Sequence, residues 1–195
     1  MQPIKTLAGA VLFATFVAGS GAQSPPADRA RTSPDSMPAR NSSGRAGTDR
    51  MNSSDSRWLT KAAQGGMAEV ALGQLAQSNA SSPDVKQFGE RMVNDHSKAN
   101  EELTRLASEK GITLPSGLDA RSQATKDRLS KLKGAAFDRA YMADMVNDHR
   151  ADVSEFQKEA NSGQDADLKA FAAKTLPTLQ EHLRMAESVH TGVKK

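Results

Sequence analysis

The sequence predicts an all-α protein in which four long helices form two antiparallel hairpins, joined by a long crossover that holds a short helix. Three observations carry this prediction. Only 4% of the residues are aromatic, and the helix-favouring residues Ala, Leu, Met and Lys are abundant. Apolar residues recur at helical spacing along four long stretches. Residues that start or stop helices bound each stretch.

The N-terminus has the pattern of a secretory signal peptide, predicted over residues 1–22. Lys5 gives a positive start, an apolar run covers Leu7 to Val17, and Ser20-Gly21-Ala22 offers small residues for cleavage. The run is too short to span a bilayer as a helix, and the alternative of a membrane anchor lacks a stop-transfer pattern. We therefore expect an exported chain with no transmembrane span after cleavage. The periplasm is the expected location, with outer-membrane association or secretion as alternatives.

Residues 23–53 are rich in Ser, Pro, Arg, Asp, Asn and Gly and contain almost nothing apolar. Such a segment buries too little surface to offset the entropy of ordering it, so it is predicted to be a disordered linker. The helical domain is then expected to cover residues 54–191.

The first long helix is predicted from Ser54 or Asp55, either of which can cap it, to about Ser78. One face carries small residues that let a neighbouring helix approach closely: Ala62, Gly66, Gly73 and Ala76. Glu69 lies on the same face, where an unpaired carboxylate is costly.

The second long helix is predicted to begin at Ser82-Pro83-Asp84 and to end at Gly111. Its core face consists of apolar residues at helical spacing: Val85, Phe88, Met92, Ala99, Leu103 and Leu106. Because the turn between the first two helices is short, they are expected to form an antiparallel hairpin.

A Pro/Gly-containing loop follows, and Asp119 is predicted to cap a short helix that is interrupted or kinked at Gly134. The third long helix is expected to end near Ser162-Gly163. Asp165 is expected to cap the fourth, which Pro177 should kink. A long connection between two hairpins is typical of ferritin-like bundles, with an up-down-up-down bundle as the alternative.

Two internal repeats support different pairings of the helices. The stretch from Ala68 to Phe88 resembles the stretch from Ala151 to Phe171, which pairs the first helix with the third and the second with the fourth. The pentapeptide Met-Val-Asn-Asp-His occurs at 92–96 and 145–149 and instead pairs the second helix with the third. The longer repeat guides the predicted architecture. In both copies of the pentapeptide, the Met and His are interpreted as core positions and the Asp as an interface or solvent group.

Three of the four histidines, His96, His149 and His182, follow an acidic residue and fall on a core face. Together with Glu69 they give one candidate ligand on each long helix, and counting residues from the turns places all four near mid-height. Imidazole nitrogens and a carboxylate converging in a bundle suit a first-row metal such as Zn, Fe, Mn or Cu. The Glu-x-x-His motif of di-iron proteins is absent.

The alternative is that these histidines are buried residues satisfied by hydrogen bonds to neighbours such as Glu69 or Asp95. Each adjacent acid is rotated about 100° from its histidine, so it is expected to pair across a helix interface. With pKa values near neutrality, three core histidines would make the bundle sensitive to mild acid.

Composition excludes several classes of function. A net charge of +3, evenly interspersed, does not indicate nucleic-acid binding. The absence of cysteine excludes disulfides, a thiol nucleophile, iron–sulfur clusters and thiolate zinc sites. No nucleophile–base pair or phosphate-binding loop is recognisable, so no catalytic residue is assigned and an enzyme ranks behind a binding or structural protein.

Motifs along the chain also resemble a known family. They include the run from Gly65 to Ala76, the stretch Arg91–Asn100, Leu114-Pro115, the stretch Phe137–His149 and Thr175–Leu183. In this order and spacing, they are similar to exported bacterial proteins with a domain of unknown function, described as outer-membrane or periplasmic proteins. The resemblance implies a ferritin-like bundle and places Glu69, His96, His149 and His182 within family motifs. It implies no activity.

The expected function is an exported, periplasmic helical bundle that binds a metal or serves in envelope stress through its core Glu and His residues. The alternative is a purely structural or partner-binding bundle, in which the partner is an envelope component or another protein.

Overall fold

The computed structural model describes residues 51–194, so the predicted signal peptide and most of the predicted linker lie outside the described residues. Within them the chain is all-α, as predicted. The elements are α1 (Ser53–Asn79), α2 (Pro83–Glu109), α3 (Ala120–Ser130), α4 (Gly134–Ser162) and α5 (Ala166–Val193). None of these helices combines the length and apolarity needed to cross a membrane.

At the starts of α1, α3 and α5 a side chain accepts from the first backbone N–H groups, whereas α2 and α4 have no side-chain cap. Asp119 accepts from the Ser122 N–H at 2.7 Å, and Asp165 accepts from the N–H groups of Asp167 and Leu168, which confirms both predicted caps. The cap of α1 is Asn52 rather than Ser54 or Asp55, and it accepts from Ser54 N–H at 2.9 Å. Asp55 does not cap α1, because its carboxylate accepts from the N–H groups of Gln164 and Asp165.

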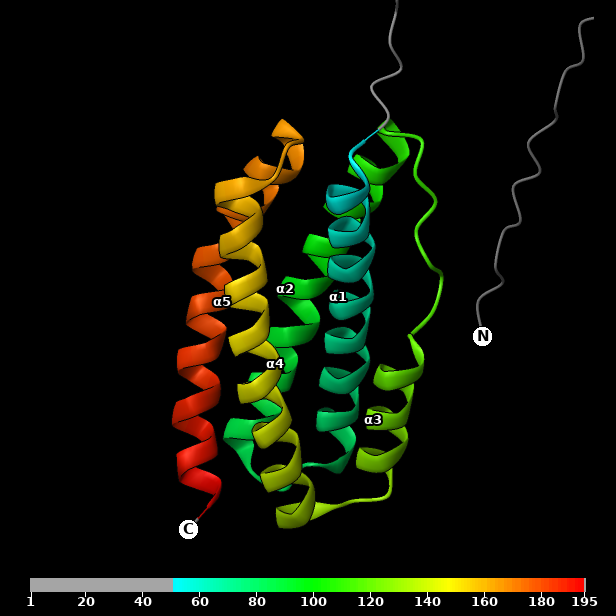
Figure 1. The fold of residues 1–195 in the computed structure, drawn as a ribbon. Helices are drawn as coiled ribbons and strands as arrows, with labels where there is room; N and C mark the ends of the chain where they lie inside the picture. Colours follow the sequence, from blue (N-terminus) through cyan, green and yellow to red (C-terminus); the bar gives the residue numbers. More distant parts are fainter. Residues whose placement is uncertain (1–50, 195) are drawn as a thin grey trace, which may run out of the picture. The chain divides into compact units, whose positions relative to one another are not determined.

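The helices form two hairpins, α1 with α2 and α4 with α5, which pack so that α1 contacts α4 and α2 contacts α5 (Figure 1). The connection from residue 110 to residue 133 includes α3, which packs on α1 and α4, and it returns the chain to the end of the bundle where α2 began. As a result α2 and α4 run parallel. The ferritin-like crossover is therefore confirmed, and the up-down-up-down alternative is wrong.

The first hairpin is packed backbone against backbone. A Cβ added to Gly73 would lie 2.6 Å from the carbonyl oxygen of Gly89, and one added to Gly89 would lie 2.7 Å from the Cβ of Ala76. Gly66 is equally tight, because an added Cβ would lie 2.1 Å from Asn100 Oδ1. The predicted small-residue face of the first helix therefore does allow α2 to approach closely.

The core is divided into two apolar clusters with polar residues between them. The cluster towards the α1–α2 turn includes Leu72, Phe88, Met92, Phe137, Tyr141, Met145 and Ala186. The cluster towards the α4–α5 turn includes Trp58, Leu59, Leu103, Phe156, Leu168, Phe171 and Leu179. On every long helix one buried polar residue falls between the two clusters: Glu69, His96, His149 and His182. The predicted height of these four residues is confirmed.

Two buried aspartates fasten the hairpins to each other, one at each end of the bundle. Asp138 on α4 accepts hydrogen bonds from the backbone N–H groups of Ser81 and Ser82 and from the Ser81 hydroxyl, all in the α1–α2 turn. At the other end, Asp55 on α1 accepts from the N–H groups of Gln164 and Asp165 in the α4–α5 turn. The alignment that pairs Ala68 with Ala151 also pairs Asp55 with Asp138, so the two copies of the longer internal repeat use equivalent residues to bind the turn of the other hairpin.

Replacing Asp138 with Ala is expected to lower the free energy of unfolding by about 2–4 kcal/mol, because three donors lose a shared carboxylate in a site that is 3% exposed. Urea denaturation followed by circular dichroism measures this loss. Asp84→Ala, which removes an exposed acid from the first turn of α2, serves as the control and should cost less than about 1 kcal/mol. Equal losses in the two variants would contradict the assigned role of Asp138.

Candidate metal centre

Three helices bring the imidazoles of His96, His149 and His182 together in the middle of the bundle. The ring centroids are 5.8 Å apart for His96 and His149, and 5.4 Å apart for each of the other two pairs. The rings are buried, with exposed fractions of 7%, 0% and 1%. One nitrogen from each ring lies within 4.8 Å of the corresponding nitrogens of the other two.

Hydrogen bonds fix the orientation and tautomer of two of these rings. His149 Nδ1 lies 2.9 Å from the carbonyl oxygen of Met145, which can only accept, so Nδ1 carries the proton. His182 Nε2 lies 3.0 Å from Asp95 Oδ2 and donates to that carboxylate. In both rings the opposite nitrogen is therefore left with a free lone pair.

Within residues 51–194 these two nitrogens, and one of His96, have no partner. His149 Nε2, His182 Nδ1 and His96 Nε2 are all buried and make no hydrogen bond to any described residue. An unpaired buried polar atom costs about 1–3 kcal/mol, so three of them on neighbouring rings need an explanation. The alternative, in which the histidines bond to neighbouring groups, holds for His182 with Asp95 and for His149 with Met145, but it leaves these three atoms without a partner among the described residues.

Burial keeps the imidazoles neutral. It lowers the pKa of His96 to about 3 and that of His149 to about 4, and the neighbouring histidines add to both effects. Burial also lowers the pKa of His182, against the opposing effect of Asp95. The expectation of pKa values near neutrality is corrected accordingly. At neutral pH all three lone pairs are available to a cation.

Glu69 lies beside His149 but towards its Nδ1, with Oε1 at 4.0 Å from that nitrogen. Its side chain is 4% exposed and its Oε2 has no hydrogen-bond partner among the described residues. Burial, followed by the charges of Asp152, Asp148 and Asp144, raises the pKa of Glu69 well above its usual range. The structure thus gathers the three predicted histidines and places the predicted carboxylate next to one of them, on the protonated side of the ring.

Asp95 is part of the centre through its hydrogen bond to His182. Burial alone would raise its pKa, but hydrogen bonds from Arg91 and His182 lower it, so Asp95 is a carboxylate at neutral pH. The prediction that an acid adjacent to a histidine pairs across a helix interface is confirmed here, because Asp95 precedes His96 yet binds His182 on α5. A carboxylate behind an imidazole is the usual support of a metal-binding histidine.

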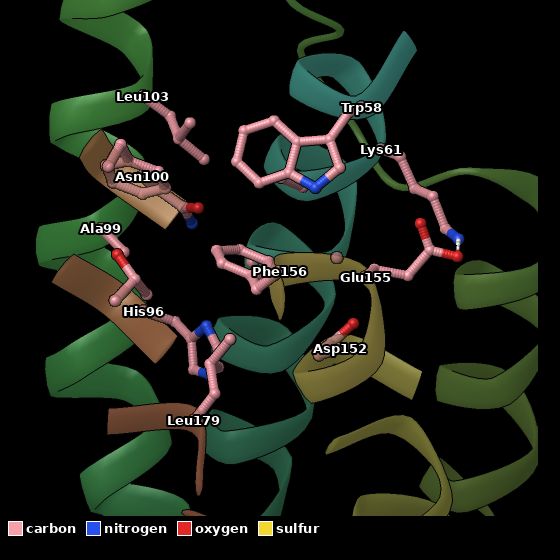
Figure 2. A pocket seen from close by; sticks show the side chains of 15 residues that line it. Trp58, Lys61, His96, Ala99, Asn100, Leu103, Asp152, Glu155, Phe156 and Leu179 are labelled. Carbon is pink, nitrogen blue, oxygen red and sulfur yellow. Dashed lines mark ion pairs between the residues drawn. The ribbon is translucent and has the colours of Figure 1, made fainter. Parts of the chain in front are cut away.

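Two hollows adjoin the centre. A cavity of about 30 Å³ borders His96 and is otherwise lined mainly by apolar side chains such as Trp58 and Phe156 (Figure 2). A groove of about 290 Å³ runs between α1, α4 and the start of α3, with Glu69 in its lining. Asp152 lines both hollows. We did not predict a role for Asp152 from the sequence, although the longer internal repeat aligns it with Glu69.

The arrangement is close to what a metal ion needs. Three nitrogens about 2.1 Å from a common ion in tetrahedral geometry are about 3.4 Å apart. The nitrogens here lie within 4.8 Å of one another, so modest side-chain rotations would close the set. The donors are uncharged and borderline in softness, which matches zinc or copper better than the oxygen-preferring Mn²⁺.

Comparison with known proteins gives a family and a fold. The family described as "Domain of unknown function (DUF4142)" matches residues 40–189, which confirms the resemblance to a family of unknown function. No curated protein matches the chain. Among solved structures, it is similar to "Crystal structure of DUF305 fragment from Deinococcus radiodurans", with 12% identity, a TM-score of 0.64, and coverage of 72% of this chain and 97% of that one. At this identity the likeness concerns the helical fold alone.

The buried histidines predict how stability depends on pH in metal-free protein. Their folded-state pKa values, about 3 for His96 and about 4 for His149, lie below the ordinary histidine value of 6.5. The unfolded chain therefore binds protons that the folded chain excludes, and their contribution to stability is lost as pH falls below about 6.5. Because Glu69 and Asp152 have raised pKa values and act in the opposite direction, the informative quantity is a difference between variants.

The wild type is expected to lose unfolding free energy as the pH falls from about 6.5 to about 4.5, and His149→Leu should reduce this loss by about 2 kcal/mol. That is the effect of one histidine whose pKa is 6.5 in the unfolded chain and about 4 in the folded chain. Urea denaturation in the presence of a chelator, at several pH values, measures how the free energy of unfolding changes with pH in the wild type and in the variant. A variant with the slope of the wild type would show that His149 is not held neutral by burial.

Proposed function

This chain belongs to the DUF4142 family, and we propose that it is an exported protein that binds one transition-metal ion at His96, His149 and His182. The observation that carries the proposal is the convergence of three buried imidazoles from different helices, each with one nitrogen within 4.8 Å of those of the other two and each with one buried nitrogen that has no partner among the described residues. A metal ion would satisfy all three lone pairs at once.

The support of the rings favours a metal over simple packing. Two of the three histidines have their other nitrogen fixed by an acceptor, Met145 carbonyl for His149 and Asp95 for His182. Such outer partners set the tautomer and raise the basicity of the coordinating nitrogen. Histidines that only filled space would need neither these outer acceptors nor a position in which one nitrogen of each ring lies within 4.8 Å of the others.

The proposed ion is Zn²⁺ or copper, since three imidazoles suit both. A divalent ion at this depth needs compensating charge. Asp95 supplies one carboxylate behind His182, and Glu69 lies beside His149, where a nearby cation would favour its ionised form. Glu69 therefore remains a candidate for either a ligand or a charge-balancing group.

Export is the second part of the proposal, and it rests on the N-terminal pattern of a positive residue, a short apolar run and small residues before position 23. In the periplasm, a single buried site would suit a protein that holds or passes on a metal ion, and a role in envelope stress fits that setting.

The decisive measurement is the metal content of mature protein purified from the periplasm without a histidine tag. We expect about one ion per chain in the wild type. Alanine at His96, His149 or His182 should weaken Zn²⁺ or Cu²⁺ binding by more than about a hundredfold, beyond the usual effect of losing an outer partner. His190→Ala is the matched control, because His190 lies near the end of α5 and outside the cluster.

Substoichiometric metal that is unchanged by these substitutions would reject metal binding. The histidines would then be structural, and the same variants would lose thermal stability by an amount independent of added metal.

The role of Asp95 gives a separate prediction. Asp95→Asn keeps the size of the side chain but removes the charge that holds His182, so Zn²⁺ affinity should fall by about 10- to 100-fold while the stoichiometry stays at one. Competition with a chromophoric chelator measures both quantities. Wild-type affinity in this variant would remove Asp95 from the centre.

A further inference from the structure

The groove between α1, α3 and α4 is acidic and leads inwards. Its lining contains five carboxylates against two cationic side chains; the acids are Glu69, Asp119, Asp144, Asp148 and Asp152, and the cations are Lys61 and Arg121. Arg121 is 90% exposed and 3.9 Å from Asp148, too solvated to neutralise the groove. Lys61 is paired with Glu155 at 3.0 Å (Figure 2). Asp144 also pairs with Arg128, and burial raises the pKa values of Glu69 and Asp152, so the acids of the groove are only partly ionised, although they outnumber its cations.

An independent feature indicates that the groove receives a ligand. Glu69 lines it, is nearly fully buried, and has an oxygen, Oε2, without a hydrogen-bond partner among the described residues. An unpaired oxygen at such a position is costly unless a cation or its water shell reaches it. Asp152, on the same side of α4, is itself mostly buried, and this burial, with the charge of Asp148 next, raises its pKa to about 7.

The groove and the cavity beside His96 meet at the same residues. Lys61, Gly65 and Asp152 line both hollows. At Gly65, an added Cβ would have no atom within 4 Å, so the backbone there borders open space. The cavity of about 30 Å³ exceeds the roughly 10–15 Å³ that one water occupies, and it ends at the imidazole of His96.

We propose that the acidic groove and this cavity form the entry path of the metal ion, with Asp152 as the carboxylate that binds a divalent cation on its way to the three histidines. This inference rests on the proposed metal site, and it adds the route and the class of ion. A divalent cation is selected in the groove by charge and oxygen ligands, and is then transferred to nitrogen ligands in the core.

The path predicts loading rates that can be measured with Cu²⁺, which quenches tryptophan fluorescence, because Trp58 is the single tryptophan of the chain and lines the cavity. In stopped-flow mixing of metal-free protein with Cu²⁺ at low ionic strength, Asp152→Asn should slow association about three- to tenfold and weaken its dependence on salt. Glu101→Gln removes the same charge from an exposed site that lines neither hollow, and should load at the wild-type rate.

Gly65 provides a steric test that changes no charge. Gly65→Leu should slow association about tenfold or more by filling the junction, whereas Gly65→Ala adds only a methyl group and should load nearly as fast as the wild type. Both substitutions favour the helix over glycine, by up to about 1 kcal/mol, so folding is not at risk. Each variant should still bind one Cu²⁺ per chain at equilibrium.

If either Asp152→Asn or Gly65→Leu loads at the wild-type rate, this path is wrong even when one ion is bound per chain. If the wild type binds no stoichiometric ion at the histidines, the proposed function itself fails, and the two failures are thus distinguishable.

Discussion

The arrangement of this bundle depends on the two aspartates that fasten its hairpins to each other. Asp55 and Asp138 each leave their own hairpin and bind backbone N–H groups in the turn of the other. A buried carboxylate with several donors is worth more than a neutral hydrogen bond, and its donors are costly to leave unpaired. These contacts fix the height of one hairpin against the other, which a smooth apolar interface would leave free to slide.

That register aligns the polar residues in one layer. His96 and His149 lie on the parallel helices α2 and α4. His182 lies in the same layer on α5, which runs antiparallel to them. Apolar clusters lie on both sides of the layer, and the resulting burial keeps the imidazoles neutral. The same burial makes unpaired nitrogens costly, which is the physical basis of the proposal that a cation binds in this layer.

The two internal repeats have different consequences. The longer repeat describes the architecture, since equivalent positions hold Asp55 and Asp138, and also Glu69 and Asp152. The pentapeptide repeat relates α2 to α4, which the crossover makes parallel, and it places His96 and His149 in one cluster. The repeats conflicted as alignments, but they are compatible in the folded chain, where one describes hairpins and the other describes a layer.

The sequence by itself determined the helices, their order and the height of the four core polar residues, because periodicity, caps and the rise per residue are local properties. It also indicated that Asp95 would pair across an interface, from its rotation relative to His96. The sequence also predicted the crossover, and the tertiary structure decided between it and the up-down-up-down alternative. Only the tertiary structure decided which ring nitrogens remain unpaired and that Glu69 lies on the Nδ1 side of His149. It also decided that Asp152 lies where the groove meets the cavity. These features depend on which helices become neighbours and on the burial that follows, and no local pattern in the chain specifies either.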